Sequence, residues 1–109
     1  MKQLIYFCKS WFRGQNRPTE VWTEEQARDK HNKGQFYTVL LESAASPSCF
    51  LEIAEKIVGV GFLDRYLREY LSYDFQEIEP GKFFLTMATH REYEGDTDKV
   101  TKGISYIFK

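Results

Sequence analysis

The chain has 109 residues, of which 42% are hydrophobic and 28% charged, and its formal net charge is −1 at pH 7. This composition is typical of a single globular domain, residues 1–109, and excludes a disordered or low-complexity chain. Apolar runs are short, and Leu4–Cys8 ends at Lys9, which excludes a membrane helix or a signal peptide, so we expect a cytoplasmic protein without membrane association.

The first third of the chain predicts a strand, a loop and a helix. Leu, Ile, Tyr and Phe are concentrated in Lys2–Cys8, which favours a β-strand, and the run KSWFRGQNRP that follows has the Gly, Asn and Pro of a loop. The segment TEEQ matches a capping box, so a helix is predicted over Glu24–Lys33, with Gly34 at its left-handed C-cap. This helix is short and mostly polar, and we expect Ala27 and His31 to face inward.

The remaining two thirds predict strands joined by turns. Two glycines in IVGVGFL indicate a bulge or a close backbone approach, and Pro80-Gly81 marks a turn between the two longest runs. The run FLDRYLREYL has both helical and strand spacing, and we favour a strand from about Arg68 after a turn or helical loop. The predicted strands are Gln35–Glu42, Cys49–Ala54, Ile57–Leu63, Glu69–Glu79, Lys82–Tyr93 and Gly103–Lys109. The fold class is α+β, an antiparallel meander of about five to six strands with one or two short helices packed on it.

Alternation along the two longest strands predicts one exposed cluster. Tyr70, Ser72 and Asp74 share one side of their strand, and the more apolar Leu71, Tyr73 and Phe75 share the side expected to face the core and the helix. On the next strand the more apolar set is expected to face the core and consists of Phe83, Leu85, Met87, Thr89 and Arg91. The candidate partner-binding residues are therefore Tyr70, Asp74, His90, Glu92 and Glu94, together with Asp96 and Asp98 in the following loop.

Charge is distributed unevenly along the chain. Residues 42–98 contain five Lys/Arg and twelve Asp/Glu, a net charge of −7, whereas residues 1–41 and 99–109 each carry +3. Acids at turns and sheet edges can simply solvate the protein. The alternative is a negative patch that steers a basic partner. Both interpretations stay open at this point.

The sequence contains no catalytic or metal-binding pattern. It lacks a phosphate-binding glycine loop and a nucleophile elbow, and its histidines and two cysteines lack zinc-site spacing. We expect free thiols at Cys8 and Cys49, and no cofactor, metal or catalysis. One alternative is a small enzyme with His90 as a general base beside Glu92. Another is a single-stranded nucleic-acid-binding domain that uses Trp11 and Phe12 with Lys9, Arg13 and Arg17. The acidic sheet opposes phosphate binding, however, and we expect no nucleic acid partner.

The segments YLSYDF, PGK and FFLTMATHREY and the closing aromatic strand lie within residues 49–108. This stretch resembles the immunity proteins of bacterial contact-dependent growth inhibition and polymorphic toxin systems. The resemblance implies a small cytosolic protein that binds and blocks the toxin domain of its own or a sister cell. It transfers no individual binding residue to this chain. The acidic block favours a nuclease, or another enzyme of polyanionic substrates, as the cognate toxin, and the sequence leaves the oligomeric state open.

Overall fold

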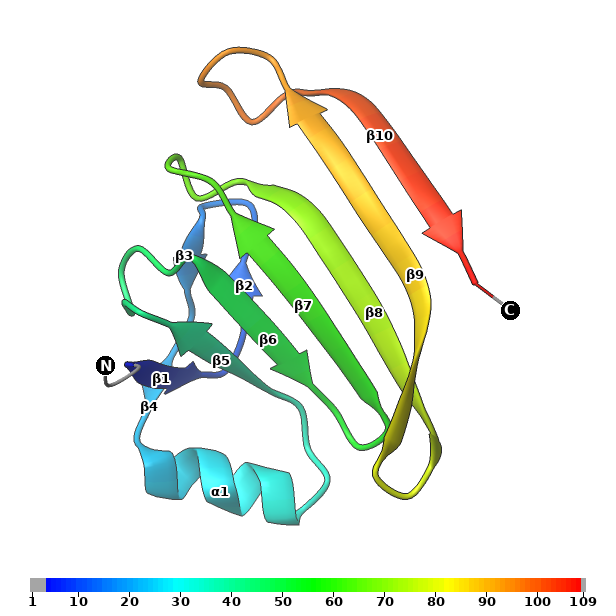
Figure 1. Cartoon of the computed structure of the whole chain (residues 1–109). Coiled ribbons are helices and arrows are strands. Elements are labelled where there is room, and N and C mark those ends of the chain that lie inside the picture. Colours follow the sequence, from blue (N-terminus) through cyan, green and yellow to red (C-terminus); the bar gives the residue numbers. More distant parts are fainter. Residues whose placement is uncertain (1–3, 109) are drawn as a thin grey trace.

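The computed structural model describes residues 4–108, which form an eight-stranded antiparallel sheet with a short helix and a small hairpin packed against it (Figure 1). The strand order is β10-β9-β8-β7-β6-β5-β1-β4, so from β5 onward each strand pairs with the next one along the chain. The sheet strands are β1 (Ile5–Cys8), β4 (Val21–Trp22), β5 (Tyr37–Leu41), β6 (Cys49–Ile53), β7 (Ile57–Leu63), β8 (Glu69–Glu79), β9 (Lys82–Tyr93) and β10 (Val100–Ile107). The other elements are α1 (Glu24–Asn32) and the hairpin strands β2 (Trp11–Phe12) and β3 (Arg17–Pro18).

The predicted α+β class with an antiparallel meander agrees with this architecture, but the number of strands was predicted too low. One missing strand is β4, whose two residues pair with β1 and are too few to produce a periodic pattern. The bounds of β7, β8 and β9 are those predicted, and Gly81 has the positive φ, +78°, that its turn requires. The first strand begins at Ile5, and Lys2 and Gln3, which were predicted to belong to it, lie outside the described residues.

The ambiguous stretch between β7 and β8 is a turn, not a helix. The Leu67 amide donates to the Asp64 carbonyl at 2.9 Å, and Leu67 has φ +61°. The Asp64 carboxylate accepts hydrogen bonds from the Arg68 amide at 3.0 Å and the Arg68 guanidinium at 2.9 Å. β10 starts three residues earlier than predicted, because Val100 already pairs with Tyr93 on β9.

Helix α1 confirms the predicted capping box. The Thr23 hydroxyl accepts from the Gln26 amide at 3.2 Å, and the Gln26 side chain accepts from the Thr23 amide at 2.9 Å. Gly34 has φ +67° just beyond the helix, as a left-handed C-cap requires. Ala27 is buried as expected, whereas His31 is exposed and contacts the Tyr37 hydroxyl at 3.1 Å. Among residues 4–108, no helix is both long and apolar enough to span a membrane.

The run predicted to be a loop after β1 is instead the β2–β3 hairpin. Trp11 pairs with Pro18, and the hairpin folds back so that the Trp11 ring stacks on Phe50 with 5.7 Å between ring centroids. Trp11 is 3% exposed and Phe50 is fully buried. Trp11 therefore belongs to the core, whereas Phe12 beside it is 43% exposed.

The strand pairing assigns residues to the two faces of the sheet, and each face covers a separate hydrophobic cluster. The face under the hairpin, here called the hairpin face, carries Leu40, Phe50, Gly61, Ser72 and Thr89 side by side and buries the cluster Cys8, Trp11, Leu40, Phe50 and Leu63. The opposite face, here called the helix face, carries Val39, Leu51, Val60, Tyr73 and Ala88 and buries the cluster Ala27, Tyr37 and Val39. α1 packs on β1, β4 and β5 and leaves the helix face of β7–β10 open.

Two β-bulges change which residues share a face. In β8, Tyr70 is an extra residue between the pairs that its neighbours make with β7. In β9, Thr86 is extra opposite the step from Asp74 to Phe75, and its hydroxyl donates to the Asp74 carbonyl at 3.0 Å. Each bulge reverses the alternation beyond it. The predicted division of inward and outward residues is therefore wrong in part, and Ser72, expected outward, is buried.

Candidate functional site

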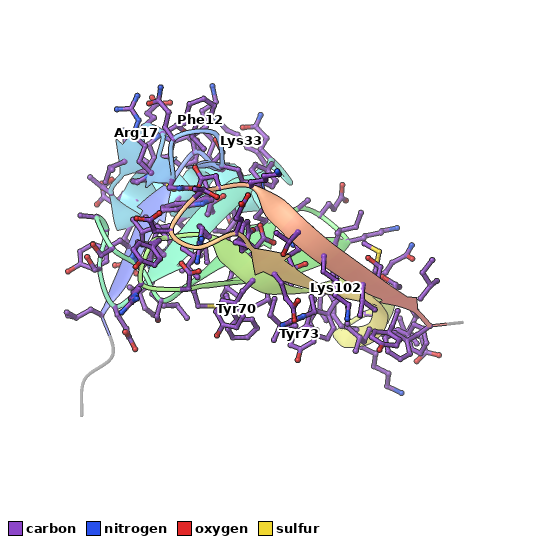
Figure 2. The ribbon with its side chains drawn as sticks, turned by 90° about the horizontal axis from the view of Figure 1, so that it is seen from above. Phe12, Arg17, Lys33, Tyr70, Tyr73 and Lys102 are labelled. Carbon is purple, nitrogen blue, oxygen red and sulfur yellow. The ribbon has the colours of Figure 1, made fainter. Side chains whose placement is uncertain are left out.

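The structure divides the seven predicted partner-binding residues among three places. On the helix face, His90 lies opposite Leu71, and Tyr70 projects to the same side of the sheet as Tyr73 (Figure 2). Asp74 pairs with Met87 on the hairpin face and is half-buried. The single exposed cluster that was predicted is thus not formed, because the bulge at Tyr70 in β8 places Tyr70 and Asp74 on different faces. The exposed acids at the end of β9 and in the loop after it are Glu92, Glu94, Asp96 and Asp98.

An aromatic surface occupies the open part of the helix face. The Phe62 and Tyr73 rings meet edge to face with centroids 5.7 Å apart, and Phe75 contacts Tyr73 in the same way at 6.4 Å. All three side chains are half-buried, and Tyr70 beside them is 38% exposed. We call Phe62, Tyr70, Tyr73 and Phe75 the aromatic platform. Phe62, Tyr73 and Phe75 stand on residues that pair between β7 and β8, with the bulge residue Tyr70 beside them, and the main contacts of α1 are with β1, β4 and β5.

The edge strand β10 extends this surface. Ile104 lies opposite His90 and Tyr106 opposite Ala88, so both side chains belong to the helix face. They are 37% and 60% exposed, respectively. The acidic residue Glu92 shares this face and pairs with Lys102 across the ladder. The open helix face therefore combines aromatic and aliphatic side chains with charged groups near its end.

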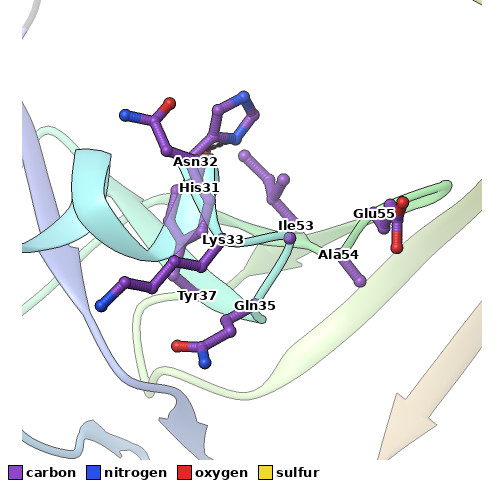
Figure 3. Close-up of a pocket in the computed structure, with 9 residues that line it drawn as sticks. His31, Asn32, Lys33, Gln35, Tyr37, Ile53, Ala54 and Glu55 are labelled. Carbon is purple, nitrogen blue, oxygen red and sulfur yellow. Dashed lines mark hydrogen bonds between the residues drawn. The ribbon is translucent and has the colours of Figure 1, made fainter.

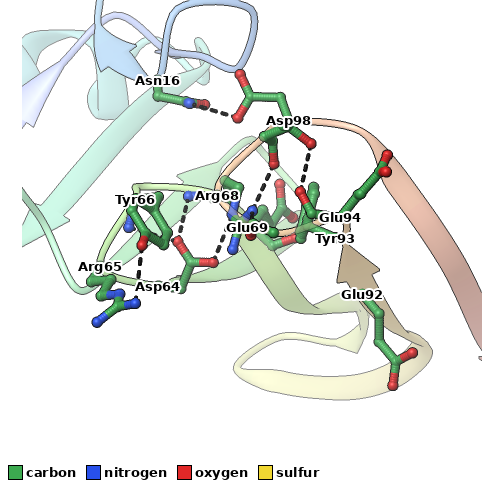
Figure 4. Close-up of polar contacts among 12 residues, drawn as sticks. Asn16, Asp64, Arg65, Tyr66, Arg68, Glu69, Glu92, Tyr93, Glu94 and Asp98 are labelled. Atoms are coloured by element: carbon green, nitrogen blue, oxygen red, sulfur yellow. Dashed lines mark hydrogen bonds and ion pairs between the residues drawn. The ribbon is translucent and has the colours of Figure 1, made fainter.

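The predicted acidic loop is held by local contacts (Figure 4). The Lys99 ammonium lies 3.5 Å from the Glu94 carboxylate, and the Thr97 hydroxyl donates to the Glu94 carbonyl at 2.6 Å. Asp98 accepts a hydrogen bond from the Asn16 side chain of the hairpin at 3.3 Å. Asp96 remains solvent-exposed. The loop acids thus lie at one end of the molecule, between the two faces, and part of their charge is paired.

A second site, not predicted from the sequence, lies on the hairpin face. It is a cleft of about 240 Å³ between the β2–β3 hairpin and the end of β9. Three arginines contribute to its walls: Arg13 from the hairpin, Arg68 from the turn before β8, and Arg91 from β9. The other lining residues are Trp11, Asn16, Glu69, Tyr93, Asp98 and Val100. We call this site the arginine cleft.

Two of these arginines form ion pairs and hydrogen bonds that fix the walls of the cleft. Arg13 pairs with Glu52 and donates to Glu69 at 2.9 Å, and Arg68 donates to Asp64 at 2.9 Å and to the carbonyls of Gly95 and Thr97 at 2.8 and 2.6 Å. The Arg68 side chain is only 10% exposed, so these bonds fix the β9–β10 loop against the sheet. The Arg68 guanidinium also lies 4.7 Å from the centre of the Tyr93 ring.

Ionisation in and around the cleft follows from these contacts. Partial burial alone would raise the pKa of Asp64, but hydrogen bonds from Arg68 and from the Tyr66 amide lower that pKa below its ordinary value. Burial opposes the charge of Arg13, and its contacts with Glu52 and Glu69 outweigh burial and raise its pKa. Burial is also the main cause of the raised pKa of Tyr93, whose hydroxyl donates to the Glu69 carbonyl at 2.6 Å.

Another hollow, of about 410 Å³, lies at the C-terminal end of α1 (Figure 3). Its walls are the end of the helix, residues 31–35, and the β6–β7 turn, residues 53–55, with Tyr37 between them. Lys33 and Glu55 place opposite charges on its rim, and Lys33 is already paired with Asp29 at 2.9 Å. The hollow contains no charged side chain that is both buried and unpaired within the described residues.

No specific observation supports either alternative function, the small enzyme or the single-stranded nucleic-acid-binding domain. Trp11 is buried against Phe50, and Arg13 is paired with two carboxylates, whereas Phe12 and Arg17 of the same hairpin are exposed. His90 and Glu92 are exposed on the helix face, two residues apart. Within residues 4–108, no three His, Cys, Asp or Glu side chains are grouped to hold a metal ion. Cys8 and Cys49 are buried free thiols.

Sequence reasoning missed the arginine cleft because its residues come from distant parts of the chain. Arg13 and Glu69 are 56 positions apart, and no local pattern predicts that they meet. The one available signal was the i,i+4 spacing of Asp64 and Arg68 in a stretch whose structure was ambiguous. Comparison of the chain with protein-family models, curated proteins and solved structures returned no match.

Proposed function

We propose that this chain is an immunity protein, a non-enzymatic inhibitor that binds a cognate toxin domain and protects the producing cell and its siblings. The observation that carries the proposal is the aromatic platform on an open sheet face. Contiguous exposed apolar surface on a monomer commonly marks a protein interaction site, whereas single exposed apolar residues are ordinary. Tyrosine and phenylalanine provide large contact areas at low conformational cost. The resemblance of residues 49–108 to immunity proteins supports the same function.

In this proposal the aromatic platform forms the centre of the interface, and the acidic residues at its end orient the toxin domain. Tyr70 and Tyr73 insert into or against the toxin surface, while Glu92 and the β9–β10 loop acids meet basic groups at the rim. Rim charges mainly raise the association rate and exclude wrong partners. The protein acts in the cytosol, where it meets a toxin domain on entry.

Growth protection tests the proposal directly. The protein is co-expressed with the toxin domain encoded beside its gene, and we expect restored growth together with a co-purifying complex. The sharpest variant pair is Tyr70→Ala and Tyr66→Ala, because Tyr66 is similarly exposed, 41% against 38%, and stands in the Asp64–Leu67 turn outside the platform. Loss of a central tyrosine commonly costs ~2 kcal/mol of binding free energy, about 30-fold in affinity. Absence of both rescue and complex, or equal effects of the two variants, contradicts the proposal.

We further propose that the toxin is a nuclease or another enzyme of polyanionic substrates. Such enzymes have a basic substrate cleft, and residues 42–98 of this chain carry a net charge of −7. Exposed charges are screened over about 10 Å at 0.1 M salt, so the association rate should fall steeply between low and physiological ionic strength. A rate that does not change with salt contradicts the electrostatic part of the proposal. Metal- or nucleotide-dependent turnover by the purified protein alone would instead favour an enzyme with His90 and Glu92 in its site.

A further inference from the structure

The arginine cleft contains one guanidinium whose hydrogen-bonding capacity is not used. Arg91 Nη1 is shielded from solvent and has no acceptor among the described residues. Arg91 Nη1 forms a long ion pair with Oε1 of Glu69 at 3.8 Å, a separation that is too great for a hydrogen bond. The other oxygen of that carboxylate is taken by Arg13 Nε at 2.9 Å. A buried donor on a charged group that lacks an acceptor costs free energy, so a bound acceptor would stabilise this arrangement.

The cleft around Arg91 is open to a ligand and is already ordered. About a third of the Arg91 side chain, 34%, is exposed, whereas Glu69 and Arg68 are 11% and 10% exposed. Arg68 fixes one wall through its bonds to the β9–β10 loop, and Arg13 fixes the other through its two carboxylate partners. The volume of about 240 Å³ suits one side-chain-sized group. Binding there requires little reorganisation.

We infer that the arginine cleft binds a carboxylate, the side chain of an aspartate or glutamate presented by a protein partner. Arg91 donates to this carboxylate when a small side-chain rotation turns its shielded Nη1 into the cleft, and guanidinium–carboxylate pairs of this kind are directional and charge-assisted. Glu69 and Asp98 also line the cleft. Their negative charges repel a doubly charged phosphate more strongly than a singly charged carboxylate. This site is on the hairpin face, opposite the aromatic platform, and does not depend on the identity of the partner.

Two peptides that differ in one group test the inference. ¹⁵N-labelled protein is titrated with acetyl-Gly-Glu-Gly-amide and, in parallel, with acetyl-Gly-Gln-Gly-amide at equal ionic strength, while the arginine Nε–Hε resonances are followed. We expect saturable shifts of the Arg91 and Arg13 resonances in the millimolar range with the glutamate peptide only. Arg91→Gln should weaken binding at least about tenfold, equivalent to ~1.4 kcal/mol. Arg65→Gln removes an exposed arginine outside the cleft and should leave binding unchanged.

Each other result overturns the inference. Equal shifts with both peptides would show that the carboxylate is not recognised, and no saturable shift would show that the cleft does not bind it. Inorganic phosphate in a third titration distinguishes the ligand class, because tighter binding of phosphate than of the glutamate peptide would replace the carboxylate by a phosphate. If Arg91→Gln fails to fold, the test rests on the wild-type titration. Resonance shifts confined to residues outside the cleft would then contradict the proposed site.

Discussion

Replacing Gly61 by alanine should destabilise the protein through a clash with one buried ring. A Cβ atom at Gly61 would lie 2.4 Å from Cζ and 2.6 Å from Cε1 of Phe50, whereas carbon atoms in contact prefer about 3.5–4.0 Å. The ring would therefore have to retreat by about 1 Å. It has little room to do so, because Trp11 stacks on it at 5.7 Å and the Arg13 guanidinium lies 5.3 Å from its centre. Overpacking of this kind typically costs about 1–3 kcal/mol.

Gly103→Ala is the matched control, because a Cβ atom there meets nothing within 4 Å. An alanine in an open strand position is expected to stabilise by about 0.5 kcal/mol through the loss of backbone freedom in the unfolded chain. Both variants are compared by urea unfolding, where the midpoint should shift in opposite directions without a change in slope. The Gly61→Ala melting temperature should fall by about 5 °C or more. If Gly61→Ala is as stable as Gly103→Ala, the Phe50 ring is not confined and the reasoning is wrong.

Three further outcomes are expected. Thr23→Ala removes the helix cap and should cost about 1 kcal/mol, measured by urea unfolding, whereas an unchanged midpoint would mean that the cap contributes nothing. Burial raises the pKa of the Cys8 thiol from 9.0 to about 11, so the neutral thiol stabilises the fold fully below pH 9 and this contribution is lost as the pH rises toward 11. The free energy of unfolding should therefore decrease less steeply with pH in Cys8→Ala than in the wild type over this range. Equal slopes would contradict this. Phe75→Ala should cost about 2 kcal/mol, less than the 3–5 kcal/mol of a fully buried phenylalanine, because Phe75 is half-buried in the aromatic platform.

Features whose cause is local could be predicted from the sequence. The capping box of α1 needs only Thr23 and Gln26, three residues apart, and both of its hydrogen bonds are formed. The turn at Pro80-Gly81 separates two strands whose bounds agree with the prediction, since proline and a glycine with positive φ leave the chain few other conformations there. The glycines of β7 were predicted to indicate a bulge or a close backbone approach. A register shift follows at Phe62–Leu63, and at Gly61 the side-chain ring of Phe50 lies close to the backbone.

Features whose cause is long-range could not be predicted in this way. The side chain of Trp11 is buried because it meets Phe50, 39 positions further along the chain, and the strand β4 exists only because β1 lies beside it. The arginine cleft requires the hairpin, the β7–β8 turn and β9 to come together. Periodicity reports the neighbours of a residue along the chain, whereas these contacts depend on which elements pack in space.

The bulges explain why the candidate site was only partly predicted, and they separate its two surfaces. A strand that alternates without interruption would keep Tyr70 with Asp74, but the extra residue in β8 turns Tyr70 to the helix face and leaves Asp74 on the hairpin face. Neighbouring residues of the same strands therefore serve an aromatic platform on one side and an arginine cleft on the other. Because the sheet separates them, Tyr70→Ala should leave carboxylate binding intact and Arg91→Gln should leave the platform intact. A shared loss of both activities would mean that the two faces form a single interface.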